Sequence, residues 1–372
     1  MSPKSPIVLS GTGLYAPPDV ISNDELVAAF NAWVDLENAS GKTLEKSSAE
    51  FIVKASGIKR RHVVDRKGIL DPQIMAPRIP ERANDEHSLQ CEMSLNAARE
   101  ALAQANASPE SVDLVIVGCS NLQRPYPAVA VEVQAALGAK GFAFDMNVAC
   151  SSATFSLAAA RDMVAAGTAR RALVVNPEIC TGHLNFRDRE SHFIFGDACT
   201  AMVIERLDGC QAKEPWEVVS TKLVTRYSNA IRNNLGFLAR CAPERRDDAD
   251  KLFVQEGRKV FKEVSPMVAD LLVSHLDESG IARDQVKRLW LHQANLTMNQ
   301  WIARKVLGRD PSETEAPNTL DEYANTSSAG SVIAFHLHRD GLAAGDVGLL
   351  CSFGAGYSAG SVIVRKSRAL TA

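Results

Sequence analysis

The fold is decided by the stretch FDMNVACSSATFSLAAA, residues 144–160. It begins as an apolar strand, reaches Cys150 and continues at once as a helix of small and apolar residues. A cysteine at a helix N-terminus lies beside unpaired backbone N–H groups and the positive end of the helix dipole. That position lowers the thiol pKa and favours the nucleophilic thiolate. The stretch therefore predicts a nucleophile, with a buried structural cysteine as the ordinary alternative.

The composition excludes several classes of protein. The chain has 372 residues, of which 46% are hydrophobic and 23% charged, and a formal net charge of −3. This balance gives no indication of nucleic-acid or membrane binding. The N-terminal segment lacks the apolar core of a signal peptide, and no apolar run reaches the roughly 20 residues that span a bilayer. The eight cysteines form no C-x-x-C pair, which predicts reduced thiols in the cytoplasm, without a disulfide framework or a metal site.

Apolar strands and helices alternate along most of the chain, which predicts an α/β fold with a sheet buried on both faces. Strands are expected at 7–14, 58–64, 112–118, 142–148, 171–176 and 198–205. Helices are expected at 22–33, 49–56, 92–105, 128–137 and 151–166. The polar, proline-rich residues 65–88 predict an extended loop.

The second part of the chain repeats the order of the first. A helix at 263–276 precedes a strand at 286–291, as the helix at 92–105 precedes the strand at 112–118. Short identities recur at slowly drifting offsets: Leu137-Gly138 as Leu307-Gly308, and residues 164–167 as 342–345. Such drift is what a duplication with small insertions leaves. We expect two similar halves, residues 1–210 and 211–372, with the irregular segment 226–256 as a candidate lid or tunnel wall.

Three further segments supply partners for Cys150. His292 ends a buried strand, Asn325 lies in a small-residue turn that opens a helix, and Gly354–Gly356 forms a turn with free backbone N–H groups. Read singly, the histidine is more often structural and the asparagine a helix N-cap. The duplication makes the helices that follow Cys150 and Asn325 pseudo-symmetric neighbours. A thiol, a base, an amide donor and a backbone donor at Gly356 would then meet at one site.

With these segments together, the sequence resembles the thiolase-fold condensing enzymes of the β-ketoacyl-acyl-carrier-protein synthase III type. The matching motifs run in family order through nearly the whole chain: NVACSS at 147–152, FGDA at 195–198, HQAN at 292–295, NTSSA at 325–329 and FGAG at 353–356. The resemblance implies a thiolase-like fold, in which two duplicated α/β halves form a five-layered αβαβα core.

The resemblance also implies a reaction and its residues. Cys150 would take the acyl group of an acyl-CoA, with the N–H groups of Cys150 and Gly356 as oxyanion hole. His292 and Asn325 would stabilise the enolate formed when malonyl-acyl-carrier protein loses CO2, and this carbanion would attack the acyl-Cys150 carbonyl. The expected function is a decarboxylating Claisen condensation in fatty-acid or related biosynthesis, with no metal or redox cofactor. The acyl chain length stays open, although the long 65–88 segment favours a donor longer than acetyl.

Peripheral contacts follow from the same resemblance. Tyr126 is the candidate aromatic that closes the acyl pocket of the partner in a homodimer, with plain dimer packing as the alternative. Phe51 stands where the family has a tryptophan that stacks on the coenzyme A adenine. Independently of the resemblance, Phe237 in the candidate lid 226–256 is a candidate substrate contact. Thr297 replaces an arginine that commonly helps to bind the carrier protein. A basic patch for that acidic partner is expected from Arg258, Lys259, Lys262, Arg304 and Lys305.

Four other functions use a similar chain. Degradative thiolases need a second cysteine in the last glycine-rich turn, but two residues separate Cys351 from Gly354. Head-to-head condensation typically needs a glutamate near residues 121–127, where none stands. A non-catalytic partner subunit would usually lack the nucleophile. Acyl transfer to an oxygen or nitrogen acceptor uses the same cysteine and remains open.

Overall fold

The protein is described here by a computed structural model that covers residues 5–367. Within these residues, nine strands form one mixed sheet in the order β11-β12-β13-β8-β1-β7-β6-β4-β5. Its strands are β1 (Ile7–Tyr15), β4 (Leu114–Gly118), β5 (Phe142–Met146), β6 (Arg171–Ile179), β7 (Asp197–Arg206), β8 (Trp216–Thr225), β11 (Val286–Leu291), β12 (Val347–Phe353) and β13 (Ser358–Lys366). Two small two-stranded sheets pair β2 (Asp19–Ser22) with β3 (Arg60–Val63) and β9 (Ile231–Arg232) with β10 (Val254–Gln255).

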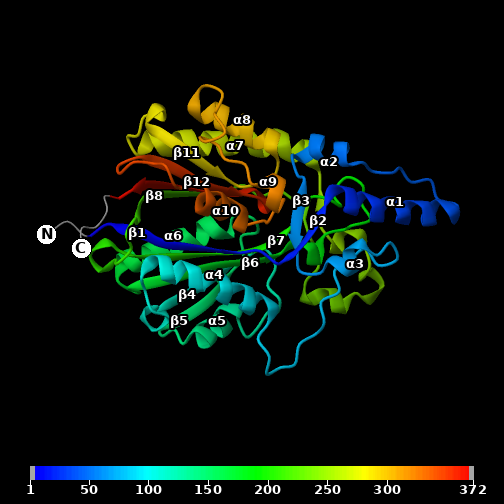
Figure 1. Ribbon diagram of the computed structural model, residues 1–372, viewed down its shortest axis with the longest axis horizontal. Helices are drawn as coiled ribbons and strands as arrows, with labels where there is room; N and C mark the ends of the chain where they lie inside the picture. The colour runs from blue at the N-terminus through cyan, green and yellow to red at the C-terminus, as the bar shows by residue number, and fades with distance from the viewer. Residues whose placement is uncertain (1–4, 368–372) are drawn as a thin grey trace.

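The helices make three layers around this sheet (Figure 1). They are α1 (Asn23–Ala39), α2 (Ala49–Ser56), α3 (Arg66–Leu70), α4 (Leu89–Ala105), α5 (Val129–Leu137), α6 (Ser152–Ala166), α7 (Gly257–Glu278), α8 (Leu296–Leu307), α9 (Leu320–Tyr323) and α10 (Ala329–Leu337). Helices α4 and α5 cover one outer face, α7 and α8 cover the other, and α6 and α10 share a core with both halves of the sheet. The result is the expected αβαβα sandwich. None of these helices is both long and apolar enough to cross a bilayer.

The two halves of the sheet are joined only weakly, through β1 and β8. Their ladder has two residue pairs, Val8 with Glu217 and Leu9 with Trp216. We keep the division into 1–210 and 211–372 as a proposal, and its boundary falls between β7 and β8.

Helix α6, which opens just after Cys150, is made of small residues because sheet approaches it from both sides. A Cβ atom on Gly118 of β4 would lie 2.2 Å from Ser156 Oγ, and one on Gly360 of β13 would lie 2.3 Å from Thr154 Oγ1. A helix packed on both faces has no solvated stripe, so its sequence is apolar and small all round. The composition of residues 151–166 is therefore a consequence of the central position.

The turns that precede α6 and α10 repeat each other in detail. Asn147 Oδ1 accepts a hydrogen bond from Ala149 N at 2.9 Å, and Asn325 Oδ1 accepts one from Ser327 N at 2.9 Å. Ala149 and Ser327 both have left-handed backbones, with φ of 46° and 50°. These pairs of residues stand at equivalent places in the two halves, which supports the duplication read from the sequence.

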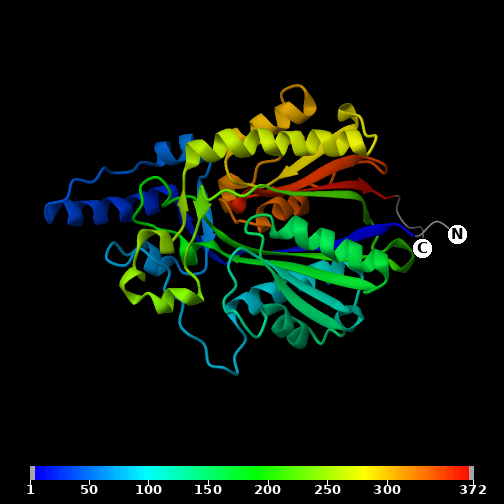
Figure 2. The same cartoon turned by 180° about the vertical axis from the view of Figure 1, so that it is seen from behind.

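One end of the sandwich carries a cap (Figures 1 and 2). Helices α1 to α3 pack with residues from the segment after β6 and with Phe253 around a separate apolar cluster. The prediction of a purely extended loop at 65–88 is wrong, because Asp65 accepts hydrogen bonds from Lys67 N and Gly68 N and so caps the short helix α3. The irregular segment 226–256 contains β9, β10 and short 3-10 turns.

Candidate active site

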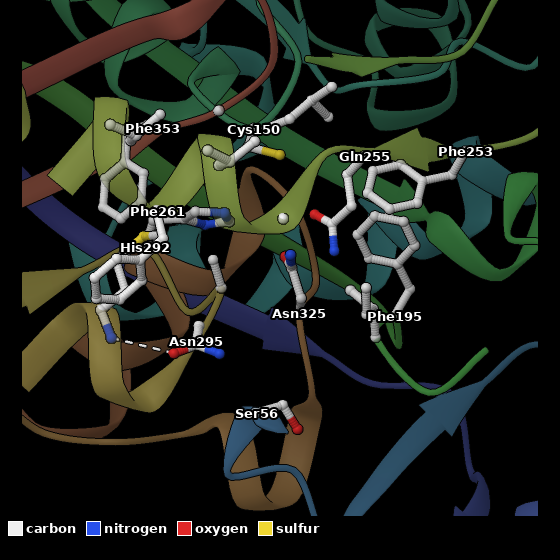
Figure 3. A pocket seen from close by; sticks show the side chains of 18 of the residues that line it. Ser56, Cys150, Phe195, Phe253, Gln255, Phe261, His292, Asn295, Asn325 and Phe353 are labelled. Atoms are coloured by element: carbon white, nitrogen blue, oxygen red, sulfur yellow. Dashed lines mark hydrogen bonds between the residues drawn. The ribbon is translucent and has the colours of Figure 1, made fainter. Parts of the chain in front are cut away.

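Cys150, His292 and Asn325 line one cavity of about 260 Å³, although they come from three distant segments (Figure 3). Cys150 lies in the turn between β5 and α6, His292 follows β11, and Asn325 precedes α10. The wall of this cavity is mostly apolar and includes Phe193, Phe195, Phe253, Phe261, Val264, Met298 and Phe353. The fold therefore brings together the three residues that the sequence singled out.

The environment of Cys150 differs from the expectation for a helix N-terminus. Desolvation by burial raises the pKa of the thiol to about 11. The nearby Ser327 hydroxyl opposes this rise in pKa, the negative charge of Glu178 adds to it, and nearby backbone N–H groups oppose it further. The predicted lowering of the pKa is thus wrong for the free enzyme, because burial outweighs the helix terminus. The resting nucleophile is a neutral thiol.

His292 is a buried, neutral imidazole. Its backbone N donates to Cys351 O at 2.7 Å, and its ring meets Phe353 edge-on with centroids 5.1 Å apart. Burial lowers the pKa of the ring to about 4, with a smaller opposing contribution from the Ser327 backbone. Nδ1 has no hydrogen-bond partner among residues 5–367. At neutral pH the ring can donate one N–H to a substrate oxygen, and it is a weak base.

Asn325 presents a hydrogen-bond donor to the cavity. Its amide oxygen is occupied by Ser327 N, so the side-chain NH2 is the group left for a ligand. Its backbone is fixed by bonds from Asn325 N to Ile194 O and from Gly196 N to Asn325 O, at 3.0 and 3.1 Å. The N-cap residue of α10 is Ser328, so Asn325 does not have the helix-capping role that was its alternative explanation.

Gly196 of the FGDA motif supports the position of Asn325. A Cβ on Gly196 would lie 2.4 Å from Tyr323 O, so only glycine lets this segment approach the chain before Asn325. The carboxylate of Asp197 accepts hydrogen bonds from Thr181 and from Val64 N. Phe195 reaches into the cavity (Figure 3).

The turn after β12 places a backbone donor near the Cys150 sulfur. The N–H that reaches the Cys150 sulfur belongs to Ala355. Gly356 has φ of 69°, a left-handed conformation that reverses the chain there. Gly354 allows the close contact, since a Cβ at that position would lie 2.5 Å from Cys150 Cβ. Ala355 N is thus a further candidate oxyanion donor beside Cys150 N, and the donor at Gly356 stays a prediction.

A second cavity of about 490 Å³ meets the first at Cys150. Phe195, Ile231 and Phe253 line both cavities, so they form the partition between them. Neither His292 nor Asn325 lines the second cavity. The Cys150 thiol thus lies between the first cavity, which contains His292 and Asn325, and the second cavity, which contains neither.

The three residues predicted to contact substrate at the periphery lie in different environments. Phe51 is in edge contact with Phe193, which lines the first cavity, and the Arg189 guanidinium lies 4.4 Å over the Phe51 ring. Tyr126 and Phe237 are 82% and 81% exposed, and neither lines either cavity of the single chain. No sequence motif indicated a role for Arg189.

The expected basic patch is split into two parts. Arg258 and Lys262 are exposed in the first turns of α7, whose residues Gly257 and Phe261 line the first cavity. Arg304 and Lys305 lie in the last turn of α8, away from the cavity. There Arg304 pairs with Asp310, and Lys305 lies over the Trp301 ring.

One cluster among residues 5–367 has the side chains of a metal site: His87, Cys91 and Glu132, with candidate ligand atoms within 4.8 Å of one another. The carboxylate of Glu132 is already engaged by Ser88 N, Ser88 Oγ and Arg124. These contacts explain the cluster as a helix-capping and ion-pair arrangement.

These features define a cysteine-dependent enzyme that condenses acyl thioesters, and the comparisons with known proteins agree. Residues 144–225 match the family model for 3-oxoacyl-[acyl-carrier-protein] synthase III, and residues 276–366 match the model for its C-terminal part. The β-ketodecanoyl-[acyl-carrier-protein] synthase of Pseudomonas aeruginosa is 62% identical over 87% of this chain and 93% of its own length. The β-ketoacyl-[acyl-carrier-protein] synthase III of a Bradyrhizobium species is 30% identical over 96% and 98% of the two chains.

Solved structures give the same assignment. The 3-oxoacyl-[acyl-carrier-protein] synthase III of Aquifex aeolicus superposes with a TM-score of 0.76 at 26% identity, over 96% of this chain and 99% of its own. The protein belongs to the β-ketoacyl-acyl-carrier-protein synthase III family. This confirms the predicted fold, family and enzyme class.

Burial of several histidines predicts a loss of stability in mild acid. The pKa values of His183, His192, His275 and His292 are each lowered to about 4, chiefly by desolvation. In the unfolded chain they bind protons from about pH 6.5 downward, so the free energy of unfolding falls between about pH 6.5 and 4 and is fully present above that window. The lowered pKa values of His336 and His338 act with these four, whereas the pKa values of Asp145, Glu178 and Asp197, which burial raises, oppose them.

We expect the urea midpoint to be clearly lower at pH 5 than at pH 7.5. The corresponding loss in the free energy of unfolding is on the order of a few kcal/mol. Urea titrations at fixed ionic strength measure it. His183→Phe should make the pH dependence shallower, because neither ring nitrogen of His183 has a hydrogen-bond partner among the described residues. A midpoint that does not change over this pH range would contradict the prediction.

Proposed function

We propose that the protein joins an eight-carbon acyl-CoA to malonyl-acyl-carrier protein, with release of CO2 and coenzyme A, to give β-ketodecanoyl-acyl-carrier protein for fatty-acid biosynthesis. The observation that carries the reaction is the convergence of a thiol, a neutral imidazole and an amide donor in one apolar cavity. The chain length rests on the name of the Pseudomonas aeruginosa relative. A ten-carbon β-keto product requires an eight-carbon donor, because malonate adds two carbons after CO2 leaves.

In the first step the acyl group moves to Cys150. The sulfur attacks the thioester carbonyl, the bond between that carbon and the coenzyme sulfur breaks, and the thiol proton leaves with coenzyme A as its thiol. Negative charge develops on the carbonyl oxygen during the attack. The N–H groups of Cys150 and Ala355 lie at this sulfur and are the donors that stabilise it.

In the second step malonyl-acyl-carrier protein loses CO2. The electron pair of the broken C–C bond becomes an enolate, whose charge lies on the thioester oxygen. We assign the stabilising donors to the neutral imidazole of His292 and the amide NH2 of Asn325. Both act in an apolar cavity, where a fixed donor is worth more than it is in water.

In the third step the enolate carbon attacks the acyl-Cys150 carbonyl and forms the new C–C bond. The tetrahedral intermediate collapses, the C–S bond to Cys150 breaks, and the thiolate takes a proton from solvent to restore the thiol. Every charge that develops meets a donor of this chain. We therefore propose that no metal or redox cofactor takes part.

The two cavities suggest where the substrates bind. The pantetheine arm would occupy the first cavity, which holds both enolate donors, and the acyl chain on Cys150 would extend into the second. We assign the coenzyme A adenine to the space between Phe51 and Arg189, where it would replace their stacking contact. Of the basic residues, Arg258 and Lys262 are the better candidates for the acidic carrier protein, because they stand on the helix that forms the cavity rim.

We also propose a homodimer. Strand β5 is the edge of the main sheet, and its residues are exposed or half-buried. An edge strand of this kind pairs readily with another chain. Tyr126 precedes α5, which packs beside β5, and it could meet the partner there. A molar mass of twice that of the chain, measured by light scattering, would support this assembly, and a monomer would refute it.

The eight cysteines are all unpaired, which favours the cytoplasm as the location of the protein.

The decisive experiment is a condensation assay over acyl-CoA donors of two to sixteen carbons with malonyl-acyl-carrier protein. We expect the highest kcat/KM at eight carbons, with CO2 and β-ketodecanoyl product formed in equal amounts. Acetyl-CoA should be poorer by about tenfold or more, because the apolar contacts of the longer chain are lost, at roughly 0.8 kcal/mol for each buried methylene. An optimum at acetyl-CoA would refute the chain length. Acyl turnover without C–C bond formation would favour the acyltransferase alternative.

A further inference from the structure

One buried carboxylate, Glu178 at the end of β6, joins the two turns that carry the chemistry. The side chain is only 1% exposed. Oε1 accepts hydrogen bonds from Ser120 N at 3.0 Å and from Ser328 N at 3.2 Å, and Oε2 accepts one from Ser120 Oγ at 2.6 Å. The Ser328 hydroxyl donates to Oε1 as well. A buried carboxylate is costly unless it is hydrogen-bonded, and here two serines provide these bonds.

The first serine leads to the nucleophile. Ser120 follows β4, and its carbonyl oxygen accepts a hydrogen bond from Asn147 Nδ2 at 3.0 Å. Asn147 Oδ1 in turn accepts from Ala149 N, the residue before Cys150. Ser120 therefore connects Glu178 to the turn that places the Cys150 sulfur.

The second serine leads to the amide donor. Ser328 is the N-cap residue of α10 and follows Ser327 directly. Ser327 N donates to the amide oxygen of Asn325, and the nearby Ser327 hydroxyl lowers the pKa of the Cys150 thiol. Ser328 therefore connects Glu178 to the turn that places the Asn325 NH2 group.

We propose that Glu178 is a positioning residue, which holds the Cys150 turn and the Asn325 turn at a fixed separation through Ser120 and Ser328. The two turns come from different halves of the chain, yet bond formation requires the acyl carbon on Cys150 and the enolate carbon held by Asn325 to meet at about 3–3.5 Å. A carboxylate suits this place because it accepts backbone N–H groups from both turns at one oxygen. The proposal rests on the proposed function.

The test compares two quantities in wild type and Glu178→Ala: CO2 released from malonyl-acyl-carrier protein, and β-ketoacyl product formed. Without the Glu178 hydrogen bonds, each turn should still perform its own half-reaction, but the distance between the two turns should no longer be fixed. We expect acylation of Cys150 and CO2 release to fall by less than about tenfold, and product per CO2 to fall by about fivefold or more. A purely structural role would lower all rates by one common factor, and that outcome would overturn the proposal.

Asp197→Asn is the matched control, because Asp197 is also a buried carboxylate that accepts backbone and hydroxyl groups, but those of Thr181 and Val64. It should lower stability and leave product per CO2 unchanged. An equal loss of coupling in Asp197→Asn would overturn the proposal. Wild-type protein that forms no β-ketoacyl product would refute the proposed function, and this proposal with it.

Glu178→Gln keeps the test decisive if the alanine variant does not fold. The glutamine oxygen can still accept both backbone N–H groups, and the Ser120 hydroxyl can turn to accept from the new amide. We expect product per CO2 within twofold of wild type. Without the carboxylate charge, iodoacetamide should alkylate Cys150 about two- to fivefold faster at pH 8, measured by mass in a Cys241→Ser background. A fall in product per CO2 of about fivefold or more in Glu178→Gln would contradict the role of these hydrogen bonds.

Discussion

Replacement of Cys150 by serine should abolish acyl transfer. Incubation of the wild-type protein with octanoyl-CoA should add one acyl mass to the peptide that contains Cys150, and Cys150→Ser should show none within the assay. We expect the condensation rate to fall by about 10³-fold or more, because a serine hydroxyl is a far poorer nucleophile at neutral pH and its site contains only a neutral imidazole of low basicity. Intact-protein and peptide mass spectrometry measure the first quantity, and product formation the second.

Two other cysteines give the controls. Cys351, the residue that a thiolase-type reaction would use, is buried in β12, and burial alone raises the pKa of its thiol. Cys351→Ala should keep acylation and condensation within a few-fold of wild type. Cys241 is exposed, so its replacement by serine excludes adventitious acylation at the surface. An acyl group found on a cysteine other than Cys150 would refute the assignment of the nucleophile.

Asn325→Asp should separate the two half-reactions. Aspartate can still accept the hydrogen bond from Ser327 N, so the turn before α10 is retained. The NH2 donor, however, becomes a carboxylate oxygen that faces the enolate with a negative charge. We expect decarboxylation and condensation to fall by about 10²–10³-fold, equivalent to about 2.7–4 kcal/mol of transition-state stabilisation. Acylation of Cys150 should change by less than about fivefold.

The measurement follows CO2 release from malonyl-acyl-carrier protein and, separately, the rate at which octanoyl-CoA acylates Cys150. Asn147→Asp is the matched control, because Asn147 holds the equivalent turn in the first half. It should affect the two half-reactions far less selectively. Equal losses of acylation and decarboxylation in Asn325→Asp would refute the assigned role of the amide as an enolate donor.

Much of the core followed from short-range pattern. The expected helices at 92–105 and 151–166 overlap α4 and α6 closely, and the strands at 112–118 and 171–176 overlap β4 and β6. β4, β6 and α6 are packed on both faces and α4 buries one face, so their apolar patterns are strong. Strands β8 and β13 and helix α8 were not predicted. β8 is half-buried along most of its length and joins the two half-sheets, so its sequence carries only a weak strand pattern.

The peripheral site residues were harder to predict for a related reason. Phe51 and Tyr126 were chosen by resemblance and Phe237 from the irregular segment 226–256, and in the single chain none of the three lines the cavity. Contacts at a rim depend on how loops fold and on a second chain, and neither leaves a periodic pattern. Glu178 was missed because a carboxylate that ends a strand looks ordinary in a sequence. Its proposed positioning role depends on hydrogen bonds from Ser120 and Ser328, which are distant from it in the chain.

By itself the sequence determined the thiolase-like duplication, the family and the identity of Cys150, His292 and Asn325, because these depend on local motifs in a fixed order. Only the tertiary structure decided the charge state of the site. The helix terminus at Cys150 suggested a thiolate, yet burial raises the pKa of the thiol to about 11 and lowers that of His292 to about 4. The tertiary structure likewise adds Ala355, whose backbone N–H lies near the Cys150 sulfur, to the candidate oxyanion donors. The physical reason is that desolvation and the direction of a backbone N–H depend on every element packed around the site, and most of those elements are distant in the chain.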